Sequence, residues 1–269
     1  MKIACPWGVA YAYTGGRPWV QGQPTVLLIH GVLNDHSVWI LQSRYLAHHG
    51  CNVLALDLPG HGRSGGHPCD SIQAYAAAML QCLDAAGIAA CAVAGHSMGS
   101  LIGLEMAAQA PTRITRLAMV ATAYPMRVAP ALLQAAQDDP PRAMAMVTTF
   151  SHSTLAPPPS ALGPGTWTHG ALDALMRRVL ASNTEHNVFV EGFKACDSYQ
   201  GAPEALAQVR CPVRLVLGTR DQMTPPKAAA SIQAALPQAD TVLVPAGHAL
   251  MTEAPEATLR ALHPWLLAT

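Results

Sequence analysis

Short, almost continuously apolar runs alternate along the chain with longer segments rich in alanine and leucine. The apolar runs cover residues 25–30, 52–57, 90–95, 117–122, 213–218 and 240–245. The longer segments cover residues 36–49, 71–86, 97–110, 226–236 and 255–267. Runs without polar alternation are typical of strands buried on both faces, and the longer segments can cross such a sheet and return. The pattern therefore predicts an α/β protein with a doubly wound, mostly parallel sheet.

The alternation stops between Tyr124 and Pro203. Joints rich in proline and glycine, at residues 139–141, 157–159 and 163–165, separate pieces of helical character at residues 143–150 and 171–180. The Met, Phe and Trp side chains of this segment need burial, which argues against a long loop. We expect residues 1–123 and 204–269 to form the core and residues 124–203 to form an inserted helical cap.

Composition excludes several classes of protein. Sixteen Lys and Arg balance 16 Asp and Glu in the 269 residues, which leaves no excess positive charge for nucleic acid or an anionic membrane. With 51% apolar and 12% charged residues, the chain has ample material for a large core. We expect a folded protein without nucleic-acid partners.

The seven cysteines are scattered, with no C-x-x-C pair and no spacing typical of zinc ligands. They favour buried thiols in a reducing compartment over disulfides or a metal site. The sequence offers neither a signal peptide nor an apolar run of roughly 18 residues to span a bilayer. We therefore expect a cytoplasmic location, with no metal and no cofactor. The oligomeric state is left open.

The sharpest local signal is the segment Gly95-His96-Ser97-Met98-Gly99, which lies between a predicted strand and a predicted helix. A serine on such a tight turn presents its hydroxyl at the carboxyl edge of the sheet, and small neighbours leave room for the turn. The adjacent helix amino terminus favours negative charge. Ser97 is the candidate nucleophile.

A serine nucleophile needs a base and a group that orients the base. Among the 12 histidines, His248 follows the last predicted strand, where its side chain can lean over the carboxyl edge of the sheet, whereas His96 is expected to face away from the Ser97 hydroxyl. Asp221 follows the penultimate strand and is the candidate orienting acid. Asp57 also ends a strand, but it comes too early in the chain and is better explained as a turn-forming carboxylate.

An oxyanion hole requires two N–H donors. The backbone N–H of Met98, directly after the nucleophile, is one candidate, and the N–H of Val32, in the turn His30-Gly31-Val32 after the first central strand, is the other. An ordinary buried valine in a glycine turn is the alternative interpretation of Val32.

These segments occur in an order that makes nearly the whole chain resemble the α/β-hydrolase family. The matching segments, in the family's order, are His30-Gly31, Asp57 to Ser64 (DLPGHGRS), Gly95 to Gly99 (GHSMG), Gly218 to Asp221 (GTRD) and Gly247-His248. The resemblance implies Ser97 as nucleophile, His248 as general base and acid, and Asp221 as its orienting carboxylate. It also implies oxyanion donors at Val32 and Met98 and a helical cap over the site.

The chemistry follows from the nucleophile. Relatives that use an aspartate nucleophile form an alkyl-enzyme ester, which Ser97 cannot form, so cleavage of an acyl group is expected. We expect a serine hydrolase, similar to carboxylesterases, that cleaves carboxylic esters of small to medium size with an apolar acyl part. The alternatives are a carbon-carbon bond or enol-lactone hydrolase on the same triad, and a small-molecule receptor with low turnover.

Overall fold

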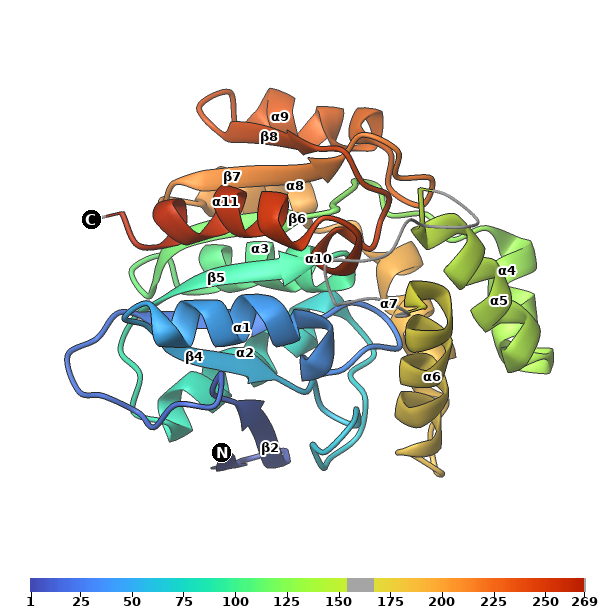
Figure 1. Ribbon diagram of the computed structural model, residues 1–269, viewed down its shortest axis with the longest axis horizontal. Helices are drawn as coiled ribbons and strands as arrows, with labels where there is room; N and C mark the ends of the chain where they lie inside the picture. Colours follow the sequence, from blue (N-terminus) through green and yellow to red (C-terminus); the bar gives the residue numbers. More distant parts are fainter. Residues whose placement is uncertain (154–166, 269) are drawn as a thin grey trace.

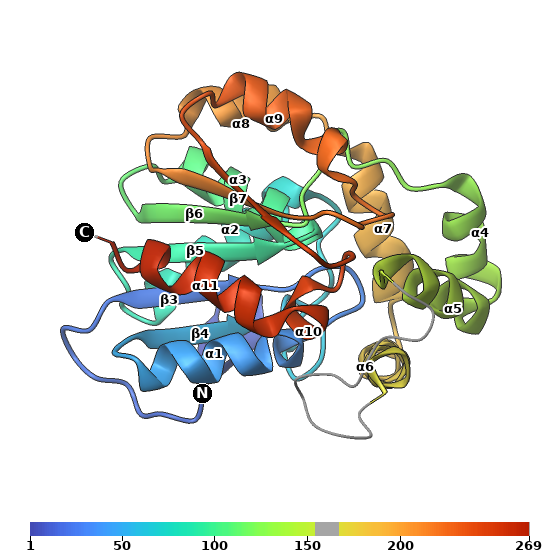
Figure 2. The ribbon, with the colours of Figure 1, turned by 45° about the horizontal axis from the view of Figure 1, so that its top comes forward.

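The computed structural model describes residues 1–153 and 167–268 and shows a sheet of eight strands with helices on both faces (Figures 1 and 2). The strands are β1 (Lys2–Cys5), β2 (Gly8–Tyr13), β3 (Thr25–Ile29), β4 (Asn52–Leu56), β5 (Cys91–His96), β6 (Ile114–Val120), β7 (Val213–Gly218) and β8 (Asp240–Val244). Their spatial order is β1-β2-β4-β3-β5-β6-β7-β8, and every pairing from β4 to β8 is parallel. The predicted α/β fold with a mostly parallel sheet is confirmed.

Two antiparallel strands extend this sheet at one edge. β1 pairs with β2, and β2 pairs with β4 through Ala12 and Tyr13. The sequence did not predict either strand, because their side chains alternate between buried and partly exposed and form no continuous apolar run. The six predicted strands are all present, although β6 begins at Ile114, three residues earlier than expected.

The continuous apolar runs are explained by burial on both faces of the sheet. In β3, Leu27 and Ile29 pack on one face while Val26 and Leu28 pack on the other, and all four are fully buried. One face is covered by α1 (Ile40–His48) and α11 (Pro255–Leu266), and the opposite face by α2 (Ile72–Ala85), α3 (Met98–Gln109) and α8 (Ala202–Gln208) (Figure 1). The short elements α9 (Ala230–Ala235) and α10 (Leu250–Glu253) complete the core, with 3-10 turns at His36–Trp39 and Pro226–Ala229.

Four more helices lie beyond the carboxyl ends of the strands (Figures 1 and 2). They are α4 (Pro130–Asp138), α5 (Pro140–Ser151), α6 (Thr168–Ala181) and α7 (Val188–Ser198). Buried side chains including Leu132, Met144, Met176 and Phe189 form an apolar cluster of their own among these helices. All four helices fall within residues 124–203, and the division of the chain into core and cap at those boundaries stays a prediction.

The expected joints at residues 157–159 and 163–165 lie outside the described residues. Across residues 1–153 and 167–268, no helix is both long enough and apolar enough to cross a bilayer.

Candidate active site

Ser97 occupies the sharp turn between β5 and α3, with φ 54° and ψ −120°. This left-handed backbone conformation is strained for a residue with a side chain and costs about 1–3 kcal/mol. The fold offsets the strain by fixing both sides of the turn: the Ser97 N–H donates to the Val120 carbonyl at 2.9 Å, and the Ser97 carbonyl accepts the Ser100 N–H at 2.8 Å. The turn thus places Ser97 at the carboxyl edge of the sheet.

The glycines on either side of Ser97 allow close backbone approach. A Cβ at Gly95 would lie 2.0 Å from the Gly99 carbonyl oxygen, and a Cβ at Gly99 would lie 2.5 Å from the Ile29 carbonyl oxygen. Neither contact is sterically possible. The G-x-S-x-G spacing is therefore required by the packing of α3 against β5 and β3.

His248 lies in the loop between β8 and α10, and its Nδ1 is 2.8 Å from Asp221 Oδ2. Both residues are buried, with exposed fractions of 5% and 4%. An ionised carboxylate can only accept, so Nδ1 carries the proton and donates it to Asp221. Nε2 is then left as the acceptor nitrogen of His248.

Asp221 receives several hydrogen bonds besides that from His248. Its Oδ1 accepts the backbone N–H groups of Met223 and Thr224, each at 2.8 Å, and the Thr224 hydroxyl lies 2.8 Å from Oδ2. Burial by itself raises the pKa of this carboxyl, but the neighbouring His248 and these hydrogen bonds outweigh burial and lower the pKa of Asp221 to about 2. Asp221 is therefore ionised at neutral pH.

Thr224 is a polar neighbour that the sequence did not single out. Its Oγ1 lies 3.0 Å from His248 Nδ1 and 3.0 Å from the Ala121 carbonyl oxygen, in addition to its contact with Asp221. Through these bonds the buried Thr224 side chain links the Asp221 loop to the end of β6. In the sequence, only its position three residues after the candidate acid Asp221 could have indicated that Thr224 lies near His248.

His96 borders the same cavity as Ser97. Its ring centroid lies 4.8 Å from that of His248, and its Nε2 lies 2.9 Å from the His248 carbonyl oxygen, which can only accept. Burial, together with the nearby His248, lowers the pKa of His96 to about 3. His96 is thus a neutral donor that fixes the backbone of His248.

The two candidate oxyanion donors flank Ser97. The turn that holds Val32 approaches the serine closely, since a Cβ on Gly31 would lie 3.1 Å from Ser97 Cβ. Met98 is the first residue of α3. Within the described parts of the chain, neither the Val32 nor the Met98 N–H donates to a backbone carbonyl outside the regular elements, so both are candidates to bind an anion.

Asp57 and its surroundings hold a turn away from His248. The fully buried carboxylate accepts the backbone N–H of His36 at 2.7 Å and that of Arg63 at 2.9 Å. His30 Nε2 accepts the Leu58 N–H at 3.0 Å. These contacts agree with the interpretation of Asp57 as a turn-forming carboxylate.

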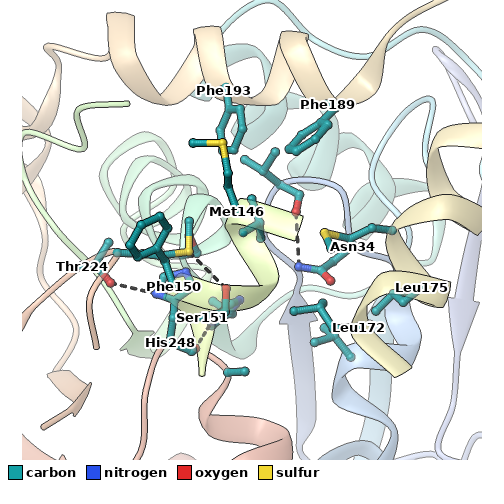
Figure 3. A pocket seen from close by; sticks show the side chains of 18 of the residues that line it. Asn34, Met146, Phe150, Ser151, Leu172, Leu175, Phe189, Phe193, Thr224 and His248 are labelled. Carbon is teal, nitrogen blue, oxygen red and sulfur yellow. Dashed lines mark hydrogen bonds between the residues drawn. The ribbon is translucent and has the colours of Figure 1, made fainter. Parts of the chain in front are cut away.

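A cavity of about 490 Å³ extends from Ser97 and His248 toward the four outer helices (Figure 3). Its apolar lining includes Val32, Val38, Met126, Leu132, Met146, Phe150, Leu172, Leu175, Met176, Phe189 and Phe193. The two arginines on the wall are engaged elsewhere: Arg178 bonds to Asp35 at 2.7 Å, and Arg127 bonds to the Asp197 carbonyl at 3.0 Å. The cavity suits a neutral, apolar ligand.

Among the residues that the structure describes, two groups of side chains could hold a metal ion, and neither borders this cavity. One is the exposed group of His67, Glu185 and His186, and the other comprises Asp35, His36 and Asp57. In the second group the donors are already paired, because His36 bonds to Asp57 and Arg178 bonds to Asp35.

Comparison with known proteins assigns the chain to a family. The model of the alpha/beta hydrolase family matches residues 26–261, and the chain belongs to that family. The chain superimposes on the crystal structure of the enol-lactonase from Burkholderia xenovorans LB400 with a TM-score of 0.83, 22% identity and full coverage of both chains. This likeness concerns the fold.

Two relatives with similar sequences match this chain over different lengths. The chain is 28% identical over 239 residues, 87% of each chain, to a Shigella flexneri protein provisionally named a carbamate hydrolase. It is 39% identical over 113 residues to the dihydrolipoyllysine-residue acetyltransferase component of the acetoin cleaving system of Cupriavidus necator. That second match covers 42% of this chain and only 29% of the relative.

Proposed function

We propose that this α/β hydrolase is a serine hydrolase that cleaves carboxylic esters of small to medium size with an apolar acyl part. The observation that carries the proposal is the buried Nδ1 to Oδ2 bond of 2.8 Å between His248 and Asp221, with His248 and Ser97 bordering the same cavity. That bond directs the acceptor nitrogen of His248 away from Asp221. Ser97, His248 and Asp221 are the proposed triad.

In the proposed reaction, Ser97 Oγ attacks the ester carbonyl carbon while His248 Nε2 takes the serine proton. The negative oxygen of the tetrahedral intermediate accepts the N–H groups of Val32 and Met98. His248 then returns the proton to the departing alcohol, leaving an acyl group on Ser97. A water molecule, deprotonated by His248, attacks this acyl-enzyme and releases the acid.

Asp221 supports both halves of the reaction. Because its pKa is about 2, Asp221 stays a carboxylate while His248 holds the proton taken from Ser97, and the charge pair stabilises that imidazolium. His96 contributes by holding the His248 backbone. No step in this scheme calls on a metal or a cofactor.

The substrate class rests on the cavity wall. Methionine, leucine and phenylalanine side chains dominate the wall, and the two arginines that border it are bonded to other residues of the protein. A free carboxylate on the acyl part would meet no unengaged cation among these. Neutral acyl chains are therefore favoured over dicarboxylate monoesters.

Lactones should be assayed as well as open-chain esters, because a lactone is a cyclic ester and a structural neighbour is an enol-lactonase. The alternatives to ester hydrolysis are carbon-carbon bond hydrolysis and ligand binding with little turnover.

The location we propose is the cytoplasm, supported by seven free cysteines that form no disulfide.

The test is a panel of neutral acyl esters, thioesters, lactones and vinylogous diketones, assayed with wild-type protein and with Ser97→Ala. We expect wild-type protein to hydrolyse esters in multiple turnovers. In Ser97→Ala the hydrolysis rate should fall by several orders of magnitude while the circular dichroism spectrum stays that of the folded protein. Ester turnover that persists in Ser97→Ala, or stoichiometric binding without turnover, would contradict the proposal.

A further inference from the structure

Asn34 lies in the turn after β3, two residues beyond Val32, and borders the cavity. Only 8% of the residue is exposed, so its side-chain amide is nearly removed from water. It is a neutral polar group on an otherwise largely apolar wall. Figure 3 shows its amide beside Leu172 and Leu175 of α6.

The orientation of the Asn34 amide is fixed by one hydrogen bond. Its Nδ2 donates to the Val32 carbonyl oxygen at 3.3 Å (Figure 3). A carbonyl oxygen can only accept, so the reversed amide would place two acceptors against each other. The nitrogen therefore faces Val32, and Oδ1 faces the other way.

Oδ1 of Asn34 has no hydrogen-bond partner among the residues that the structure describes. An acceptor buried without a donor is costly, and native proteins rarely leave one unless a ligand or water completes it. A purely apolar acyl chain filling the cavity would leave Oδ1 unpaired. A ligand with a donor at that point would complete it.

One other acceptor on the wall, His96 Nδ1, is also buried without a partner among the described residues, but it lies against Gly31, where a Cβ would be 3.2 Å from it. Arg178 carries only donors and is bonded to Asp35, and the Ser37 hydroxyl donates to Asp35 at 2.6 Å. The Thr168 hydroxyl is also buried on the wall without a partner among the described residues, but a hydroxyl can rotate to donate or accept. Asn34 Oδ1 can only accept.

We propose that the acyl part of the substrate carries a neutral hydrogen-bond donor, an amide N–H or a hydroxyl, that binds Asn34 Oδ1. This inference rests on the proposed hydrolysis at Ser97 and narrows its substrate class. The acyl chain is apolar apart from that donor. A carboxylate at the same point is disfavoured, because it would bring a second acceptor to Oδ1.

The experiment compares methyl esters that differ only by N–H against CH2. N-hexanoylglycine methyl ester is matched with methyl 4-oxononanoate, N-hexanoyl-β-alanine methyl ester with methyl 5-oxodecanoate, and the γ-aminobutyrate homologue with methyl 6-oxoundecanoate. The series moves the N–H away from the reacting carbonyl in single-atom steps. Acid release in a pH-stat gives kcat/KM for each pair.

At one position of the series we expect the N–H ester to be favoured about tenfold over its partner, the effect of one well-placed hydrogen bond to a buried acceptor. In Asn34→Leu the ratio should fall to about one. The ratio is the quantity compared, because loss of the Nδ2 bond to Val32 affects both esters of a pair. Thr168→Val, which removes the unpartnered Thr168 hydroxyl from the same wall, is the control and should keep the ratio.

A second measurement separates the two proposals. Calorimetric titration of Ser97→Ala protein with each pair measures binding without hydrolysis and should show the same tenfold preference, lost on adding Asn34→Leu. If this preference is present but wild-type protein hydrolyses neither ester, the hydrolase proposal fails and the donor site stands. Equal binding of both members at every position, or a preference that Thr168→Val abolishes and Asn34→Leu preserves, overturns the inference.

Discussion

At the scale of single residues, the two oxygens of Asp221 have different partners. Oδ1 accepts two backbone N–H groups, while Oδ2 faces the His248 ring. This asymmetry determines what an amide would do at the same position. An asparagine must place its oxygen toward the two N–H groups and its NH2 toward His248.

Asp221→Asn is therefore expected to invert the tautomer of His248. The asparagine NH2 would donate to Nδ1 and leave the proton on Nε2, which could no longer accept from Ser97. We expect kcat to fall by about ten-thousand-fold, as in the equivalent change in a serine protease. Steady-state kinetics on a neutral acyl ester measures this.

The matched control is Asp57→Asn, which also changes a buried aspartate at a strand end. Asp57 accepts backbone N–H groups in a turn away from His248, so its loss should lower stability and leave kcat of the folded fraction within tenfold of wild type. Comparable losses of kcat in both variants, or near-normal turnover in Asp221→Asn, would remove Asp221 from the triad.

At the scale of elements, the turn between β5 and α3 works only because α3 packs so closely on the sheet. Gly95→Ala would place a methyl group 2.0 Å from the Gly99 carbonyl oxygen, so β5 and α3 would have to separate. We expect this variant to lose at least about 2 kcal/mol of unfolding free energy and most of its activity. Urea unfolding and ester hydrolysis measure the two effects.

Gly65→Ala is the control for that substitution. The nearest heavy atom to the added Cβ would be the Val9 backbone nitrogen at 3.6 Å, which is an ordinary contact. The substitution should therefore change the free energy of unfolding by less than about 1 kcal/mol. Indistinguishable unfolding curves for the two alanine variants would refute the packing argument.

The sequence predicted those elements whose pattern is set by local burial. Strands such as β3 and β5 were found because helices cover both their faces, whereas β1 and β2 alternate and belong to an edge that only tertiary pairing defines. Helices α4 and α7 were missed as well. Most of their buried residues pack among the outer helices rather than on the sheet, although Ala195 and Cys196 of α7 join the main core. Helix α4 is only nine residues long and begins at a proline.

The candidate site followed from the same logic. Ser97, Asp221 and His248 were singled out because each follows a strand whose end lies on one edge of the sheet, and the structure brings the last two into contact. Thr224 and Asn34 lie in irregular loops, where no periodicity indicates which way a side chain points. Their contacts with His248 and Val32 required the folded chain.

At the scale of the whole molecule, the cavity lies between the sheet edge and helices α4 to α7. Its apolar wall predicts that kcat/KM rises with acyl length until the cavity of about 490 Å³ is full. Each added methylene contributes up to about 0.8 kcal/mol, which is roughly fourfold. Methyl esters from acetyl to decanoyl measure the profile, and a flat profile or a preference for dicarboxylate monoesters would contradict an apolar acyl site.

The burial of neutral histidines affects the stability of the whole protein. Burial lowers the pKa of both His61 and His96 from about 6.5 to about 3. The unfolded chain therefore binds more protons as the pH falls below 6.5, so the stability present at neutral pH is lost between pH 6.5 and pH 3. Each histidine contributes up to about 1.4 kcal/mol per pH unit in that range.

Urea unfolding at pH 7, 6 and 5 should show this loss. His61→Asn should reduce the slope, because the asparagine NH2 can take over the 2.9 Å bond from Nδ1 to the Pro59 carbonyl without titrating. Stability that stays constant from pH 7 to pH 5, or a slope that His61→Asn leaves unchanged, would argue against neutral buried histidines.

The central claim is that Ser97 is the activated nucleophile of a triad, and covalent labelling tests it most directly. Wild-type protein is treated with a fluorophosphonate probe and then analysed by intact-mass and peptide mass spectrometry. The account predicts rapid addition of one probe per chain, on Ser97 alone, and no addition to folded Ser97→Ala protein. Labelling that persists in Ser97→Ala, or a wild-type protein whose Ser97 stays unmodified, would contradict it.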